Sequence, residues 1–113
     1  MITLKSEQQL QTDFKSGNVI LLFSADWCPD CRFIDPFMPE IEEKYREDFM
    51  FVYVDRDQFI DLCANYNVFG IPSFVALADG EVVDRFISKD RKTREEIEDF
   101  LNGVQAKLES THK

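Results

Sequence analysis

The fold is decided by residues 19–31, which read Val-Ile-Leu-Leu-Phe-Ser-Ala-Asp-Trp-Cys-Pro-Asp-Cys. The first five of these residues form an unbroken apolar run, which is typical of a strand buried on both faces. A helix is expected to begin at or just after Cys28. Cys28 and Cys31 would then lie one helical turn apart, beside the carboxyl end of a buried strand.

This position gives a cysteine pair a specific chemistry. A cysteine at a helix N-terminus faces unpaired backbone N–H groups and the positive end of the helix dipole. Both features stabilise a thiolate, which is the form that attacks disulfides. We therefore expect Cys28 to be the nucleophile and Cys31 to be the resolving thiol, which closes a ring with Cys28 and releases the bound partner. The pair indicates thiol–disulfide exchange.

Composition limits the other functions that the chain could have. Its 113 residues fit one domain, and a hydrophobic fraction of 44% suffices for one core. Acidic residues outnumber basic ones by 22 to 13, which gives a formal net charge of -9. Such a charge argues against binding to nucleic acids or to anionic membranes.

The sequence also predicts a compartment. The start, residues 1–5, lacks the basic and apolar stretches of a signal peptide, and the longest apolar run is too short to cross a bilayer. We expect a cytoplasmic protein. In a reducing cytosol, a close cysteine pair is redox-active or metal-binding rather than structural.

Hydrophobic spacing, capping boxes and turn residues predict an alternation of helices and strands. The expected elements are a helix from Ser6 that stops at Gly17, a strand at 19–23, a helix from about 28 to 45 with a kink at Pro36, a strand at 49–54, a helix at 58–65, strands at 73–77 and 81–87 around a turn at 78–80, and a helix that opens at Thr93. A frayed tail is expected from about residue 108. This order predicts a single compact three-layer α/β domain over residues 1–113, because parallel strands need crossover helices and a hairpin can close one edge of the sheet.

With these features the sequence resembles the thioredoxin family over nearly the whole chain. The resemblance is carried by residues 23–32, by Pro36, by residues 66–73 and by residues 79–83. A Cys-x-x-Cys motif alone would be weak support, but here Gly70-Ile71-Pro72 follows at the family's downstream position. The resemblance implies the thioredoxin fold, with a central mixed sheet of four or five strands flanked by about four helices.

The resemblance also implies roles for individual residues. Cys28 would be an exposed nucleophile and Cys31 a buried resolving thiol. The Ile71–Pro72 bond would be cis and lie beside Cys28, and the backbone of Ile71 would pair with an extended substrate. Residues expected to contact substrate are Trp27, Pro29, Asp30, Ile71, Pro72, Ser88 and Lys89.

The chain departs from the family pattern in three places. Pro29-Asp30 replaces the usual Gly-Pro, as in some thioredoxin-related cytosolic reductases. The family's buried aspartate falls at Leu22 and its lysine partner at Phe51, so the carboxylate that would take the Cys31 proton is missing. We expect slow release of mixed disulfides for this reason, with Asp30 as a candidate substitute for the lost carboxylate. Ser88-Lys89 replaces a small Gly-Ala surface near the site.

The function expected from these observations is reduction of protein or small-molecule disulfides in the cytosol through a Cys28/Cys31 dithiol. No bound cofactor is expected beyond this redox-active disulfide. Electrons would come indirectly from NADPH, through a thioredoxin-reductase-like enzyme or a low-molecular-weight thiol. Expected partners are disulfide-containing proteins, with no nucleic acid and no membrane, and the chain is expected to be a monomer.

Two alternatives stay open at this stage. The first is a binding or adaptor module whose thiols are incidental. The second is a metal or iron–sulfur carrier, which would have to bring together Cys28, Cys31, Cys63 and His112. Cys63 itself is interpreted as a small buried hydrophobe or a regulatory thiol. The basic run at residues 89–94 is either a solvated loop or a docking site for an acidic partner.

Overall fold

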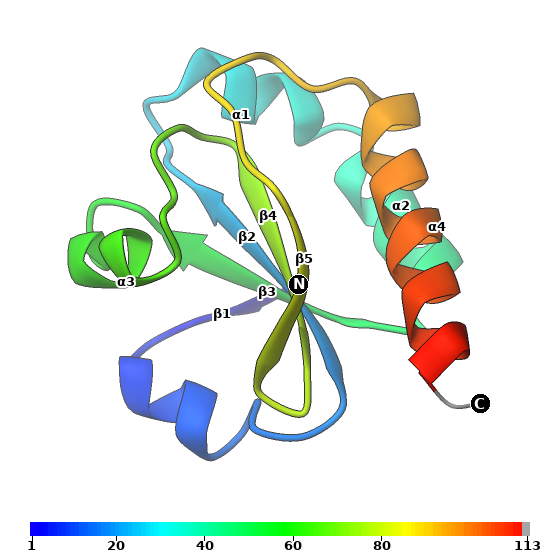
Figure 1. Ribbon diagram of the computed structural model, residues 1–113. Helices are drawn as coiled ribbons and strands as arrows, with labels where there is room; N and C mark the ends of the chain where they lie inside the picture. The colour runs from blue at the N-terminus through cyan, green and yellow to red at the C-terminus, as the bar shows by residue number, and fades with distance from the viewer. Residues whose placement is uncertain (112–113) are drawn as a thin grey trace.

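The computed structural model describes residues 1–111, with side-chain surroundings up to residue 109. Its elements are β1 (Ile2–Thr3), the short 3-10 helix η1 (Glu7–Gln11), β2 (Asn18–Ser24), α1 (Pro29–Ile34), α2 (Met38–Tyr45), β3 (Met50–Asp55), α3 (Ile60–Asn65), β4 (Ser73–Ala78), β5 (Glu81–Phe86) and α4 (Arg94–Thr111). The strands form one sheet in the order β1-β3-β2-β4-β5 (Figure 1). β1, β3 and β2 run parallel, whereas β4 and β5 are antiparallel to their neighbours.

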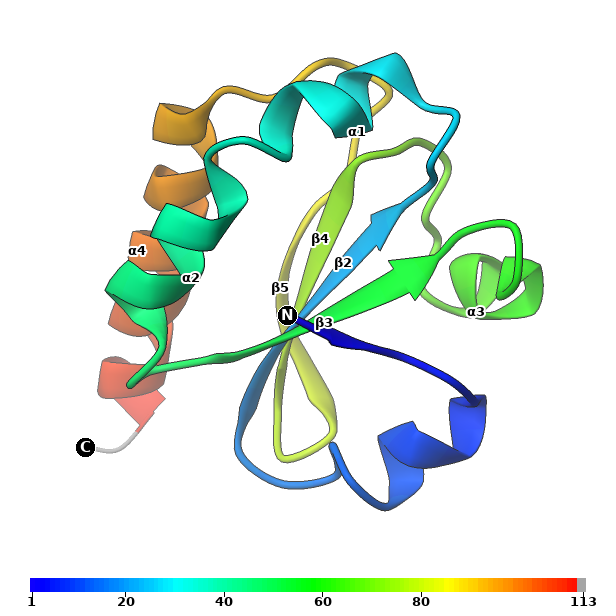
Figure 2. The ribbon, with the colours of Figure 1, turned by 180° about the vertical axis from the view of Figure 1, so that it is seen from behind.

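Helices cover both faces of this sheet, as Figures 1 and 2 show from opposite sides. One buried cluster joins α1, α2 and α4 to the sheet, and a second joins η1 and α3 to its other face. The expected three-layer α/β architecture with a mixed sheet is confirmed.

The central strand β2 supplies both clusters, because successive side chains of a strand point to opposite faces. Val19, Leu21 and Phe23 belong to the cluster under α3, and Ile20 and Leu22 belong to the cluster under α2 and α4. This double burial is why the strand is an unbroken apolar run. It also keeps β2 in the middle of the sheet, and the cysteine pair lies at the carboxyl end of this strand.

The helix that follows the cysteines is interrupted rather than kinked. α1 ends at Ile34 and α2 begins at Met38. Pro36 lacks the N–H that would continue the first helix, and a proline ring clashes with the carbonyl four residues earlier. Phe33 of α1 is exposed.

Three other elements differ from the expected ones. β1 was not expected, and the first helix is a short 3-10 helix. α4 continues through Thr111, and Leu108 packs against the cluster on its face of the sheet, so the tail expected from residue 108 does not begin there. Residues 112–113 lie outside the described residues. The start of α4 is as predicted, since Thr93 and Glu96 form the reciprocal bonds of a capping box.

Candidate active site

The cysteine pair lies at the carboxyl end of β2, at the start of α1. Cys28 is the N-terminal cap of this helix and Pro29 is its first residue. The Cys28 sulfur accepts a hydrogen bond from the backbone N–H of Cys31 at 3.2 Å. An N–H group directed at the sulfur stabilises negative charge on it, which is the arrangement that the sequence predicted.

The two thiols differ in their surroundings. Cys28 is 5% exposed and lines a groove, whereas Cys31 is 1% exposed. Burial raises the pKa of Cys31 to about 12, and the hydrogen bond with Cys28 adds to this shift. The expectation of an exposed Cys28 was wrong in degree, because the residue is buried and its sulfur contacts the N–H of Cys31 and the carbonyl of Ile71. Cys28 still lines the groove.

The groove has a volume of about 430 Å³. Its lining includes six of the residues expected to contact substrate or attack it, and four that were not expected there. The first group is Trp27, Cys28, Pro29, Asp30, Ile71 and Lys89, and the second is Arg56, Val68, Phe69 and Gly70. Pro72 and Ser88 do not line the groove.

The wall opposite Cys28 is the segment before β4. The Ile71–Pro72 peptide bond is cis, as the resemblance implied, and the Cys28 sulfur lies 3.9 Å from the carbonyl oxygen of Ile71. Pro72 is buried behind Ile71. At Gly70 the chain comes so close to the next loop that a Cβ atom would lie 2.6 Å from the backbone oxygen of Ser88.

Aromatic side chains flank the groove on its outer side. Trp27 is 59% exposed and Phe69 is 66% exposed. The indole N–H of Trp27 donates to Asp57 at 2.6 Å, and the Arg56 guanidinium lies 5.9 Å from the centre of the indole ring. These contacts hold Trp27 in place while its ring stays accessible, which suits a surface that receives a partner.

The basic run at residues 89–94 is not a continuous docking surface. Arg91 pairs with Asp30 at 3.0 Å and lies over Phe33, and Arg94 pairs with Glu98. Within this run, Lys89 is the basic residue that lines the groove. Asp30 is engaged by Arg91, which makes it a poor candidate for the acceptor of the Cys31 proton.

Lys92 is buried and holds the loop before α4. Its ammonium donates to the backbone oxygens of Ser88 and Asp90 and to the Ser88 hydroxyl, at 3.0 to 3.3 Å. Burial lowers the pKa of this lysine. Ser88 therefore supports the loop that carries Lys89. This inward role explains why Ser88 does not line the groove.

The core beneath the site is apolar at the two positions where the resemblance implied a buried ion pair. Leu22 and Phe51 are both buried in the cluster under α2 and α4. Neither can accept a proton. Any group that takes the proton of Cys31 must therefore be found elsewhere.

The three cysteines proposed for a metal site do not come together. Cys63 lies in the cluster on the α3 side of the sheet, apart from Cys28 and Cys31, and burial raises its pKa. His112 lies outside the described residues. Among the residues that the structure describes, no three His, Cys, Asp or Glu side chains are grouped to hold a metal ion.

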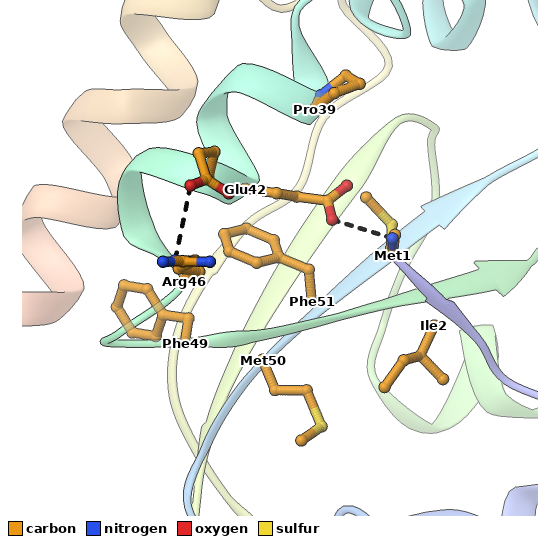
Figure 3. Close-up of a pocket in the computed structure, with 9 residues that line it drawn as sticks. Met1, Ile2, Pro39, Glu42, Arg46, Phe49, Met50 and Phe51 are labelled. Atoms are coloured by element: carbon orange, nitrogen blue, oxygen red, sulfur yellow. Dashed lines mark ion pairs between the residues drawn. The ribbon is translucent and has the colours of Figure 1, made fainter.

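A second hollow, of about 480 Å³, lies at the β1 edge of the sheet (Figure 3). It is lined by Met1, Ile2, Met50 and residues of α2, and Glu42 pairs there with the N-terminal ammonium at 3.0 Å. No cysteine lines this hollow. Across residues 1–111, none of the helices is long and apolar enough to span a bilayer.

A mixed five-stranded sheet with a dithiol at a helix start, facing a cis-proline segment, defines a thioredoxin-fold thiol–disulfide oxidoreductase. Comparison with known proteins agrees with this class: the family model described as Thioredoxin matches residues 2–103. The chain therefore belongs to the thioredoxin family.

Several relatives resemble the chain over most of its length. A thioredoxin H-type of Populus jackii is 33% identical over 80% of this chain and 67% of its own. The thioredoxin of Bacillus subtilis (strain 168) is 28% identical over 89% of this chain and 95% of its own. A TPR repeat-containing thioredoxin of Oryza sativa subsp. japonica is 32% identical, and this chain spans 30% of its length.

Among solved structures, a mutant thioredoxin from Halobacterium salinarum has a TM-score of 0.77 at 24% identity. The match covers 91% of this chain and 88% of the Halobacterium salinarum chain. This likeness supports the fold.

Arg56 and Phe69 are two of the four groove residues that were not expected as contacts from the sequence. Arg56 reaches the site because its backbone N–H bonds to the carbonyl of Ser24, at the carboxyl ends of two parallel strands. The adjacency of those strand ends was the signal that could have found it.

Proposed function

We propose that this protein reduces disulfides of proteins or small molecules in a reducing compartment, with Cys28 as nucleophile and Cys31 as resolving thiol. One observation carries the proposal: the Cys28 sulfur caps α1, accepts the Cys31 N–H, and opens into the groove opposite the cis Ile71–Pro72 segment. The difference in surroundings between the two thiols supports the order of attack.

The reaction has two exchanges. The Cys28 thiolate attacks one sulfur of the substrate disulfide, the substrate S–S bond breaks, and the first substrate thiolate leaves. The Cys31 thiolate then attacks the Cys28 sulfur, the mixed disulfide breaks, and the second substrate thiolate leaves. The substrate gains two electrons and two protons, and the Cys28–Cys31 pair becomes a disulfide.

Family membership implies disulfide substrates and a reducing system that recycles the oxidised pair. For this chain the donor is an external dithiol enzyme supplied by NADPH, or a low-molecular-weight thiol. The protein acts as a monomer in the cytoplasm, without a bound cofactor.

Substrate is received as an extended segment. Trp27, Pro29 and Phe69 offer apolar contacts around the attacked sulfur, and the backbone of Ile71 offers strand-like pairing. Lys89 adds positive charge at the groove, whereas Arg56 is paired with Asp57 at 3.1 Å. Segments with an acidic residue near the disulfide are therefore preferred at Lys89. Ser88 and Pro72 contribute by holding the loops that form the walls.

The test is a trapping experiment. Cys31→Ser should retain covalently bound partners on Cys28, and these partners identify the substrates and the electron donor. Cys28→Ser should abolish the reduction of a disulfide protein such as insulin, whereas Cys63→Ser should keep it. Turnover that survives in Cys28→Ser, or no reduction by the wild type with any thiol donor, would overturn the proposal.

A further inference from the structure

The fate of the Cys31 proton is open in this active site. Cys31 is a buried thiol that must lose its proton before it can attack the mixed disulfide. Leu22 and Phe51 are apolar, and Asp30 is engaged by Arg91. None of these residues provides an outlet.

Two hydroxyl groups lie one step further along the same two strands. β2 and β3 are parallel neighbours, with Ile20 opposite Phe51 and Leu22 opposite Tyr53. Because alternate residues of a strand share a face, Ser24 and Tyr53 lie on the face that carries Leu22 and Phe51. The polar side chains on this face therefore lie two residues beyond Leu22 and Phe51, towards the carboxyl ends of the strands, where α1 begins.

These two hydroxyls form a connected chain with Cys31. The buried Ser24 side chain hydrogen-bonds to the Cys31 thiol and to the Tyr53 hydroxyl. The bond from Ser24 lowers the pKa of Cys31, against the larger effect of burial. Ser24 is thus the side-chain hydroxyl in contact with both the resolving thiol and a second proton carrier.

The chain of hydroxyls leads to solvent. A polar pocket of about 470 Å³ is separate from the substrate groove and shares no lining residue with it. It is lined by Ser24, Ala25, Asp26, Arg32, Asp35 and Tyr53. Tyr53 is half-buried, so its hydroxyl joins the buried Ser24 to a pocket with two carboxylates.

We propose that Ser24 and Tyr53 relay the proton of Cys31 to water in this pocket when the mixed disulfide is resolved. The inference rests on the proposed function, because it concerns the second exchange of the same reaction. It gives the site a proton outlet that opens into a pocket separate from the substrate groove.

The step balances as a relay. The Cys31 proton passes to the Ser24 oxygen, the Ser24 proton passes to the Tyr53 oxygen, and the Tyr53 proton passes to a water molecule beside Asp26 and Asp35. Both hydroxyls end neutral, and one proton reaches solvent. The Cys31 thiolate then forms the S–S bond with Cys28, and the electron pair of the broken bond leaves on the substrate sulfur.

Charged and titratable groups around Cys31 act on the same step. Cys28 opposes ionisation of Cys31 in the reduced pair, and this effect ends once Cys28 is in a mixed disulfide. The Lys92 ammonium interacts favourably with a Cys31 thiolate, and Asp26 and Asp55 interact with Tyr53 and oppose its ionisation. Tyr53 therefore passes a proton on without holding a charge.

The experiment follows resolution directly with a thionitrobenzoate disulfide as substrate. Attack by Cys28 releases the first coloured thiolate, and attack by Cys31 releases the second, so the two exchanges appear as two phases. In Cys31→Ser only the first phase remains. The second phase is measured across pH for Ser24→Ala, Ser24→Thr and Tyr53→Phe.

Loss of a hydroxyl bond to a charged sulfur should slow the second phase about tenfold in Ser24→Ala and raise the midpoint of its pH profile by about one unit. Tyr53→Phe should slow it by about threefold, because the outer carrier is lost while the Ser24 bond remains. Ser24→Thr should restore the rate. Tyr66→Phe is the matched control, since this tyrosine packs on the α3 side of the sheet and should leave both phases unchanged.

The outcomes separate this inference from the proposed function. Absence of the first phase in the wild type would overturn the function itself. A normal first phase with an unchanged second phase and pH profile in both Ser24→Ala and Tyr53→Phe would overturn the relay alone. If Ser24→Ala does not fold, an unchanged rate of the second phase in Tyr53→Phe still overturns it.

Discussion

The two active-site cysteines are made unequal by their surroundings, although they are three residues apart. Cys28 lies at the start of α1 with an N–H group directed at its sulfur, and it borders the groove. Cys31 lies beneath it, and two of the causes that raise its pKa come from Cys28 itself. When Cys28 enters a mixed disulfide, these two effects disappear, so Cys31 becomes easier to ionise at the stage when it must attack.

This inequality predicts selective alkylation. In the reduced protein near neutral pH, iodoacetamide should modify Cys28 first, because the pKa values of Cys31 and Cys63 are both raised by burial. Mass spectrometry after limited reaction should find one modified site, and Cys28→Ser should react at least about tenfold more slowly. Equal modification of Cys31 or Cys63 would contradict the assignment of roles.

The apolar Leu22 position predicts a gain from restoring a carboxylate. Leu22→Asp should speed the second exchange, because a buried carboxylate beside the relay can hold the Cys31 proton. It should also cost about 2 to 5 kcal/mol of stability, since a polar group enters an apolar cluster. Leu22→Asn is the matched control, with nearly the same shape and no basic site. Single-turnover mixing separates the two, and equal rates in the three proteins would remove the prediction.

At the scale of elements, the site is assembled where several chain segments meet. α1 brings the cysteines, the segment before β4 brings Gly70 and Ile71, and the loop before α4 brings Lys89. The buried Lys92 fixes this last loop from within, and the pair of Arg91 with Asp30 ties it to the start of α1. The width of the groove therefore depends on how closely these segments pack.

Gly70 is the position where this packing is tightest. Gly70→Ala would place a Cβ atom 2.6 Å from the Ser88 backbone oxygen and 2.8 Å from the Lys89 Cα, so one of the two segments must move. We expect a loss of about 1 to 3 kcal/mol in stability and a fall of about tenfold in disulfide reduction.

Gly103→Ala is the control for this change. Nothing lies within 4 Å of its added Cβ, and alanine favours a helix, so α4 should gain about 0.5 to 1 kcal/mol with unchanged activity. Urea unfolding and an insulin reduction assay measure both effects. Normal activity in a stable Gly70→Ala variant would show that the groove does not depend on this contact.

Elements with a local signal could be predicted from the sequence, and elements decided by tertiary contacts could not. The start of α4 was predictable because the cap bonds of Thr93 and Glu96 join residues three apart. The break at Pro36 was only half predictable, since the missing N–H is local but the restart of a helix at Met38 depends on packing. β1 has two exposed residues and exists because it pairs with β3.

The same distinction applies to the site. The cysteine pair and Pro72 were found from short motifs, whereas Arg56, Ser24 and Tyr53 enter the site through the pairing of β2 with β3. The basic run at residues 89–94 could not be judged as a docking surface from the sequence, because the structure decides which of its charges are paired. Those charges are bound by Asp30, Glu98 and the Ser88 loop. Charge spacing alone does not reveal which charges are already paired.

At the scale of the whole molecule, the sheet separates two apolar cores and leaves the thiol chemistry at one of its ends. Burial extends to several groups that ionise at high pH: it raises the pKa values of Cys31, Cys63, Tyr45, Tyr53 and Tyr66. The lowered pKa of Lys92 acts in the opposite sense. The acids with raised pKa values outnumber the lysine with a lowered one. The free energy of unfolding should therefore fall as the pH becomes alkaline.

The contribution of Cys31 to this weakening can be isolated by its redox state. In the unfolded chain the thiol loses its proton around its ordinary pKa of 9.0, whereas in the folded chain it keeps the proton up to about 12. The folded state therefore binds more protons between these values, and stability falls as pH rises through this window. In the oxidised protein Cys31 is part of a disulfide and does not titrate.

Between about pH 8 and about pH 10, the free energy of unfolding of the reduced form should thus fall by about 1 kcal/mol more than that of the oxidised form. Urea unfolding of both forms at the two pH values measures this difference, and Cys31→Ala, kept reduced, should lose the extra dependence. Parallel pH dependences in the two redox forms would mean that Cys31 is not shielded as the structure describes.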